Sequence, residues 1–238
     1  MDMKDIVKEF DINAILGENN LTCQCGKRHT VSVKDVVIER GAIARVPGLL
    51  KKYGGSRPFL IADRNTFKAA GEAVCDILSK DKLPYSQFVF EASPEPDEFA
   101  VGQVVMQYDP RCDFILGVGS GTINDICKII AHATGLPYLI VGTAPSMDGY
   151  ASATSSVIQD GIKHSLNTLC PTVIVADLDI MCKAPLRLLQ AGLGDMLAKY
   201  ISICEWRISH LVTGEYYCEE VAALVRGALK KCIAVKDI

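Results

Sequence analysis

Five short apolar runs recur between residues 58 and 177, and segments with helical spacing separate the first four of them. Each run is long enough for a buried strand and too short for an ordinary helix. Strands that alternate with helices of about a dozen residues predict a parallel sheet with helices on both faces. The expected strands are PFLIAD (58–63), SQFVFE (86–91), DFILGV (113–118), YLIV (138–141) and TVIVAD (172–177), and the expected helices are 66–79, 96–108 and 122–134.

The segments around this alternation follow other patterns. We expect a charged helix from Lys4 to about Ile15, and a hairpin over residues 23–40, where polar and apolar residues alternate. TSSVIQDGIKHSL (154–166) is typical of an irregular hairpin, and from about Ala184 onward the spacing is helical.

Two domains are therefore expected, an α/β domain over residues 1–180 and the first helices of an all-helical domain over residues 181–238. The last expected helix reaches Ile238 without a capping glycine or a closing loop. We expect the helical domain to be truncated there.

The charge pattern excludes several classes of partner. The formal net charge is −3, and Lys and Arg are scattered along the chain, which argues against a nucleic-acid or anionic-membrane surface. The first residues, MDMKDIVKEF, are charged where a signal peptide would be apolar. No apolar run approaches the roughly 20 residues that a membrane span needs. A soluble cytoplasmic protein without a nucleic-acid or membrane partner is expected.

The chain contains ten cysteines, most of them inside apolar segments. Without a secretory signal, we expect reduced cysteines in the core and no disulfides. Cys23, Cys25 and His29 form the one group that resembles a metal-ligand set. This group lacks CxxC spacing and a second half, so the sequence favours core or surface side chains there over a zinc site.

A glycine-rich segment, GVGSGT (117–122), follows an expected buried strand and opens an amphipathic helix. Glycines let backbone N–H groups approach a phosphate, and a helix N-terminus favours negative charge, so a pyrophosphate is the natural ligand. The segment is neither GxGxxG in the first βα unit nor a P-loop. A tight turn without a ligand remains the alternative.

Polar residues that could bind a ligand occur in three further places. Two of these places are at the ends of expected strands, and one is on an apolar helix face. Asp63 ends an early strand, where it would suit a ribose hydroxyl and repel a 2′-phosphate, or would cap the next helix. The segment TAPSMDGYAS (143–152) is dense in hydroxyl groups at the same sheet edge, which favours ligand binding. Asp195 has apolar neighbours, and either a metal ion or an ion pair with Lys199 would satisfy its carboxylate.

Taken together, GVGSGTINDICK, TAPSMDGYAS, DGIKHS and AGLGDMLAKY resemble the superfamily of iron-containing alcohol dehydrogenases and dehydroquinate synthases. Within it, they resemble most the glycerol-1-phosphate dehydrogenases. The resemblance implies a Rossmann-like domain that binds NAD or NADP, followed by a helical domain, with coenzyme, one divalent metal (zinc, or nickel or iron) and substrate in the cleft between them. The coenzyme contacts that the resemblance implies are Gly121, Thr122, Ile123, Asn124, Asp125, Thr143, Ala144, Pro145, Ser146 and Ser152, and the strand-end and glycine-turn patterns add Asp63, Gly119 and Ser120.

The resemblance also implies the reaction and the residues that serve it. The expected substrate is a small phosphorylated polyol: dihydroxyacetone phosphate is reduced to sn-glycerol 1-phosphate, while the metal polarises the carbonyl. Asp148 matches the substrate-binding aspartate, Asp195 matches the first metal ligand, and Lys163 is a candidate for the substrate phosphate. A homodimer is expected as one mode of assembly.

The histidines depart from the family pattern, which needs two imidazole ligands well beyond Asp195. His29, His132 and His164 precede Asp195, and His210 lies about 22 Å further along the same expected helix. We therefore expect the two histidine ligands beyond Ile238 and an incomplete metal site in this chain. A glycerol dehydrogenase, a dehydroquinate synthase-like enzyme and a non-catalytic NAD-binding fragment remain alternatives.

Overall fold

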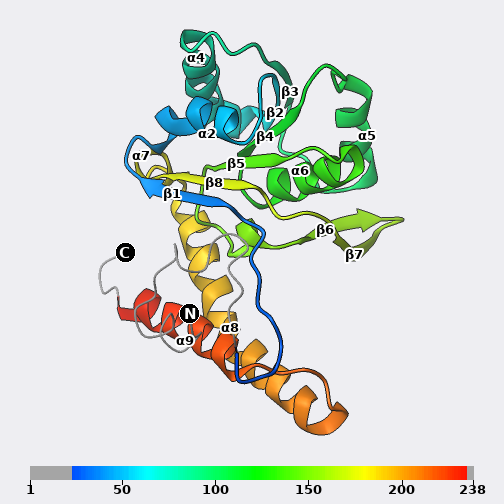
Figure 1. Ribbon diagram of the computed structural model, residues 1–238, viewed down its shortest axis with the longest axis vertical. Helices are drawn as coiled ribbons and strands as arrows, with labels where there is room; N and C mark the ends of the chain where they lie inside the picture. The colour runs from blue at the N-terminus through cyan, green and yellow to red at the C-terminus, as the bar shows by residue number, and fades with distance from the viewer. Residues whose placement is uncertain (1–22, 235–238) are drawn as a thin grey trace.

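The computed structural model describes residues 23–234, which form an α/β part and a helical part (Figure 1). The helix expected from Lys4 to Ile15 lies outside the described residues. The α/β part is built on a six-stranded sheet with the order β1-β8-β5-β4-β2-β3, and all its neighbouring strands are parallel. The strands are β1 (Asp35–Glu39), β2 (Pro58–Asp63), β3 (Ser86–Phe90), β4 (Phe114–Gly119), β5 (Tyr138–Gly142) and β8 (Val173–Asp177).

Helices cover both faces of the sheet, as the alternation predicts. Alternate residues of β2 enter separate cores: Leu60 packs with one set of helices and Ile61 with the other. Strands buried on both faces read as continuous apolar runs, which is why β2, β4, β5 and β8 were predictable. One face carries η2 (Ala42–Arg45), α2 (Val46–Lys52) and the continuous helical segment of α3 (Arg64–Thr66), η3 (Phe67–Gly71) and α4 (Glu72–Lys80); the other carries α5 (Glu98–Gln107) and α6 (Gly121–Thr134).

The hairpin expected over residues 23–40 is wrong. Strand β1 joins the edge of the main sheet instead, parallel to β8, with Asp35 opposite Val173 and Glu39 opposite Asp177. Alternation of polar and apolar residues describes a half-buried strand but does not name its partner, which here lies far away in sequence. The carboxylate of Asp177 fixes the exit from β1, because it accepts hydrogen bonds from the N–H groups of Gly41 and Ile43 (3.1 and 3.2 Å).

The second expected hairpin is confirmed. Strands β6 (Thr154–Gln159) and β7 (Ile162–Asn167) are antiparallel and project beyond the main sheet. Their two-residue connection, Asp160-Gly161, has positive φ at both positions (50° and 77°), the backbone that a tight hairpin turn demands.

The helical part begins after β8, as expected. It consists of α7 (Leu178–Met181), α8 (Leu186–Thr213) and α9 (Glu219–Ala234). Gly214 ends α8 in the left-handed conformation, which lets the chain turn back into α9. Within residues 23–234, no helix combines the length and the apolar character needed to cross a membrane.

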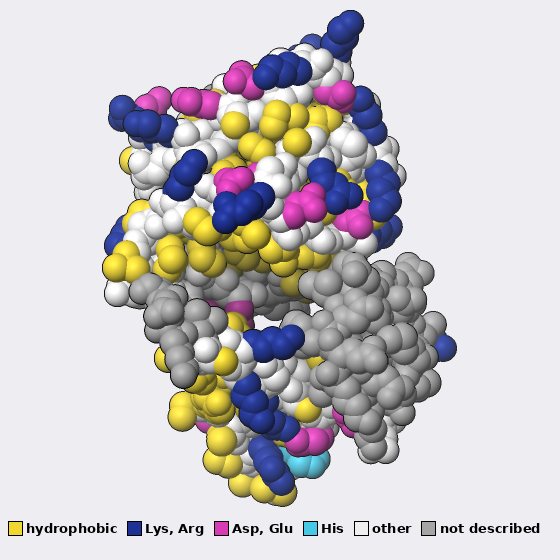
Figure 2. Space-filling view, turned by 90° about the vertical axis from the view of Figure 1, so that its left-hand side faces the viewer, with side chains coloured by type: hydrophobic (Ala, Val, Ile, Leu, Met, Phe, Trp, Pro, Cys, Tyr) yellow, Lys and Arg dark blue, Asp and Glu magenta, His cyan; other side chains and the backbone are white. Residues whose placement is uncertain are grey.

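Acidic and basic side chains are mixed on one face of the molecule (Figure 2). On the face shown in Figure 2, Lys and Arg side chains are distributed over the α/β part and are interleaved with acidic ones. Exposed apolar side chains occur along α8, among them Ile201, Ile208, Leu211 and Val212.

Candidate functional site

A cleft of about 920 Å³ opens at the carboxyl edge of the sheet, where the strand order reverses. The chain leaves β2 for the edge strand β3 and then returns past β2 to β4, so loops on the two sides of this crossover diverge. Open α/β sheets bind ligands at such a point. Asp63 lines the cleft from the end of β2, and Ser120 and Thr122 line it from the turn after β4.

The turn between β4 and α6 is shaped by close packing. Gly119 is the last residue of β4, and a Cβ there would lie 2.5 Å from Cβ of Ile123, so no other residue fits without moving the helix. The Gly119 carbonyl accepts the N–H of Thr143 at 3.1 Å, which holds the neighbouring loop against the turn. The N-terminus of the 14-residue helix α6 therefore stands at the cleft, where its backbone N–H groups favour an anion.

The predicted coenzyme contacts Ile123 and Asn124, which follow the turn, have different surroundings. Ile123 lines the cleft together with Ser120 and Thr122. Asn124 is buried instead, where its Oδ1 accepts from Tyr138 (3.0 Å) and its Nδ2 donates to the Gly149 carbonyl (3.3 Å). Asn124 therefore ties α6 to the loop after β5.

Lys128 is a buried cation that sequence reasoning missed. Its ammonium contacts Asp125 Oδ1 (3.4 Å) and donates to the carbonyls of Gly149 (3.1 Å) and Thr154 (2.9 Å). Burial lowers the pKa of Lys128 and raises the pKa of Asp125. The available signal was a lysine within the apolar run ICKII, one turn after Asn124.

Asp63 caps a helix and also lines the cleft, so both of its predicted roles remain compatible. Its Oδ1 accepts from the N–H groups of Asn65 (2.7 Å) and Thr66 (3.0 Å), while the Thr66 hydroxyl accepts the Asp63 N–H. Because both cap bonds fall on Oδ1, they do not involve Oδ2.

The predicted coenzyme contacts in the loop after β5 also differ in their surroundings. Thr143 and Ala144 line the cleft, and the Tyr150 hydroxyl fixes the loop by donating to the Ala144 carbonyl at 2.8 Å. Pro145 and the following residues lie against α8, where a Cβ on Gly192 would come within 1.8 Å of the Pro145 carbonyl oxygen. The predicted contact Ser152 accepts the N–H of Thr154 (3.0 Å) in the turn leading to β6.

Asp148 and Asp195 come together, as the predicted site requires, and Lys199 joins them. The Asp148 N–H donates to Asp195 Oδ2 at 2.9 Å, and the Lys199 ammonium lies 3.1 Å from a carboxylate oxygen of each aspartate. This backbone N–H and the ammonium hold the pKa of the Asp195 carboxyl below its usual value. The i,i+4 ion pair expected as an alternative is thus present, and it extends to the loop after β5.

The described residues do not by themselves complete a catalytic metal site at Asp195. His210 lies on the same unbroken helix 15 residues further on, about 22 Å along its axis, and its Nδ1 is 2.6 Å from the Glu215 carbonyl oxygen. His132 and His164 are exposed on α6 and β7. In residues 23–234, the one convergent group of three or more His, Cys, Asp or Glu ligand atoms lies elsewhere, at Cys23, Cys25, His29 and Cys218.

The basic residues that line the cleft do not include Lys163, the one predicted from the sequence. Lys163 lies exposed on β7. Lys68 of η3, Lys183 after α7 and Arg187 of α8 line the cleft together with Asp63 and the residues at the start of α6. These three were missed because each is isolated in sequence and only the fold gathers them.

The fold and the motifs have clear counterparts among known proteins. The family model described as iron-containing alcohol dehydrogenase matches residues 37–185. A glycerol-1-phosphate dehydrogenase (NAD(P)+) of Halalkalibacterium halodurans is 33% identical over 220 residues, which cover 90% of this chain and 55% of the relative. A protein of the same name from Hyperthermus butylicus is 35% identical over 202 residues, covering 83% and 56%.

A solved structure shares the fold. NADH-dependent butanol dehydrogenase A from Thermotoga maritima superimposes with a TM-score of 0.70 at 16% identity, over 86% of this chain and 55% of that one. The chain spans about half the length of the curated relatives it matches.

Proposed function

The chain belongs to the iron-containing alcohol dehydrogenase family, and we propose that it forms the coenzyme-binding part of an NAD(P)-dependent dehydrogenase. The observation that carries this proposal is the cleft at the crossover of the sheet, between Asp63 and the N-terminus of α6. A dinucleotide has an anionic pyrophosphate flanked by two riboses, and the cleft offers partners for the pyrophosphate and for a ribose.

The coenzyme's pyrophosphate is assigned to the turn at Ser120 and Thr122. There the helix N-terminus supplies backbone N–H groups, and Lys183 and Arg187 add positive charge to the lining of the same cleft. Asp63 stands at the end of β2, where Oδ2 would accept a ribose hydroxyl while Oδ1 keeps the helix cap. Thr143 and Ala144 form the side of the cleft beyond the turn.

The proposed reaction is the interconversion of dihydroxyacetone phosphate and sn-glycerol 1-phosphate. Its support is the shared name of relatives that are 31–35% identical over at least 80% of the chain. Asp148 is proposed to contact the substrate and Asp195 to bind one divalent metal, with imidazole ligands from outside the described residues. A shared role is supported because the Lys199 ammonium contacts both carboxylates, and the Asp148 N–H donates to Asp195.

The reaction is tested by the oxidation of NADH or NADPH with dihydroxyacetone phosphate, in protein expressed from the complete reading frame and supplied with zinc, nickel or iron. We expect the phosphorylated substrate to be at least about tenfold more efficient than dihydroxyacetone, since a phosphate adds charge-assisted hydrogen bonds. Asp195→Asn should abolish turnover and leave NADH binding unchanged.

The matched control is Asp160→Asn, which removes an exposed carboxylate at a turn whose positive φ asparagine tolerates. It should keep full activity. Equal turnover of the unphosphorylated ketone would contradict the substrate assignment, and so would NADH binding without any turnover of the phosphate ester.

A further inference from the structure

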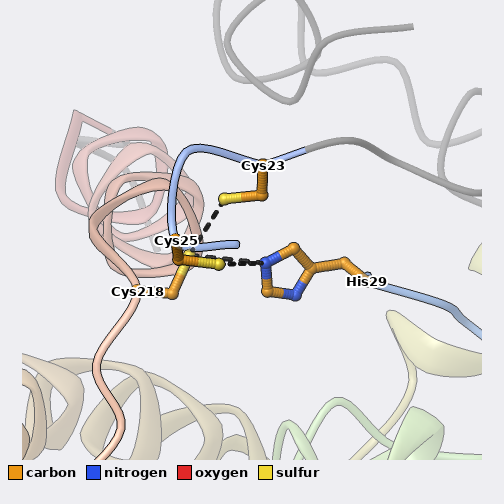
Figure 3. A group of neighbouring side chains, drawn as sticks. All are labelled: Cys23, Cys25, His29 and Cys218. Carbon is orange, nitrogen blue, oxygen red and sulfur yellow. Dashed lines mark hydrogen bonds between the residues drawn. The ribbon is translucent and has the colours of Figure 1, made fainter. Parts of the chain in front are cut away.

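Four metal-ligating side chains that the proposed function does not use converge beside the helical part (Figure 3). Cys23, Cys25 and His29 come from the segment before β1, and Cys218 comes from the residue before α9. Their ligand atoms all lie within 4.8 Å of one another. The sequence indicated only three of the four, because Cys218 follows His29 by 189 residues and forms no motif with it.

The spacing of these atoms matches a tetrahedral zinc ion. Zinc binds sulfur at about 2.3 Å and imidazole nitrogen at about 2.0–2.1 Å, so tetrahedral ligands lie about 3.8 Å (S to S) and about 3.6 Å (S to N) apart. Sγ of Cys23 is 3.5 Å from Sγ of Cys218, and His29 Nε2 is 3.3 Å from Cys25 Sγ and 3.5 Å from Cys218 Sγ. A disulfide requires sulfur atoms at about 2.05 Å, well inside these separations.

We propose that Cys23, Cys25, His29 and Cys218 bind one structural Zn²⁺ ion. With three thiolates and one imidazole the coordination shell is closed, which is typical of structural rather than catalytic zinc. Binding releases the three thiol protons to solvent and involves no change of oxidation state.

The surroundings suit a site whose ligands carry net negative charge. Three thiolates, one neutral imidazole and Zn²⁺ sum to −1. The Tyr216 hydroxyl lies 3.2 Å from Cys25 Sγ and can donate to a thiolate, and the Lys27 ammonium lies 3.7 Å from the centre of the Tyr216 ring. Partners of this kind orient metal ligands and temper their charge.

The loop that carries Cys218 is held independently of any metal. Trp206 of α8 donates from Nε1 to the Tyr216 carbonyl at 2.6 Å, and its ring packs against Tyr217 with centroids 4.6 Å apart. Cys218 itself is buried and directly precedes α9. One of the four ligands is thus held in place by contacts that need no metal.

The ion would tie two distant segments together. The chain runs from Cys23 to His29 beside the α8–α9 pair and then rises to the edge strand β1 (Figure 1). A shared metal would fasten this entry segment to the helical pair and thereby limit how far the helical part moves relative to the sheet. The site shares no residue with the coenzyme cleft, so its test is independent of the proposed reaction.

The test is the zinc content of the purified 238-residue chain, with cobalt substitution as the second readout. We expect one zinc per chain and, after exchange for Co²⁺, the strong near-ultraviolet absorption of thiolate-to-cobalt charge transfer. Cys218→Ser should lose both signals, Cys218→His should keep the bound ion because imidazole can replace the thiolate, and Asp195→Asn should change neither. The matched control is Cys182→Ser, which removes an exposed thiol outside the cluster and should change neither signal.

Three results would overturn the site. They are a chain that takes up no metal when zinc is supplied, cobalt bound without thiolate charge transfer, and a disulfide between Cys23 and Cys218 revealed by a mass two hydrogens lower. If Cys218→Ser does not fold, chelation of the wild-type chain decides. Removal of the ion should then lower the unfolding temperature of the wild type and of Cys182→Ser alike, and an unchanged unfolding temperature counts against a structural role.

Discussion

Gly192→Ala is expected to destabilise the protein by about 3 kcal/mol, because the added Cβ meets backbone rather than a movable side chain. A Cβ at Gly192 would lie 1.8 Å from the carbonyl oxygen of Pro145, so α8 must move away from the loop after β5. The same movement would separate Asp195 from the Asp148 N–H, and it would weaken coenzyme binding because it displaces the loop that carries Thr143 and Ala144. Urea unfolding and NADH titration of the variant measure the two effects.

Gly194→Ala is the matched control for this substitution. Gly194 lies two residues further along α8, and a Cβ there meets nothing within 4 Å. Alanine at this position should stabilise the helix by up to about 1 kcal/mol and leave NADH affinity unchanged. Equal stability of the two alanine variants would show that α8 does not rest against the loop.

Lys128→Met is expected to lower the free energy of unfolding by about 3 kcal/mol, because it removes a buried cation and leaves its partly buried carboxylate and carbonyl partners behind. Asp125 loses its counter-charge, and the carbonyls of Gly149 and Thr154 lose a shared donor. The loop after β5 would loosen from α6, and NADH affinity should fall with stability. The readouts are denaturant unfolding and coenzyme titration.

Two further variants separate charge from packing. Lys128→Met combined with Asp125→Asn should recover part of the lost stability, since no partly buried carboxylate is then left without its cation. Lys163→Met, at an exposed lysine of β7, should change stability by less than about 0.5 kcal/mol. If the single Lys128 variant is as stable as the Lys163 variant, the contacts of the Lys128 ammonium contribute nothing to stability.

Local sequence patterns were sufficient for most of the sheet. Strands such as β2 and β4 are buried on both faces, so each one is a short, continuous apolar run whose length and neighbours identify it. The edge strand β1 was assigned to the wrong partner, because only long-range packing brings Asp35 opposite Val173. Pairing is a property of the whole fold, and periodicity describes only one strand at a time.

The candidate site was predictable only where it follows strand ends. The turn at Ser120 and the loop at Thr143 lie at the carboxyl edge by topology alone, and both line the cleft. Side chains that act through distant partners could not be found in this way. In the sequence, Lys128 cannot be distinguished from an ordinary helical lysine, nor Cys218 from another core cysteine. Only the fold brings the carbonyls of Gly149 and Thr154 to Lys128 and brings His29 to Cys218.

Coenzyme binding in the cleft at the strand crossover can be measured by titrating NADH into the isotope-labelled chain and following its backbone amide resonances. We expect saturable shifts at Ser120, Gly121 and Thr122 and at Thr143 and Ala144, at coenzyme concentrations up to about 1 mM. The amides from Cys23 to His29, which lie outside the cleft lining, serve as internal controls and should not move. Shifts confined to other regions, or no saturable shift at all, would show that this cleft does not bind the coenzyme.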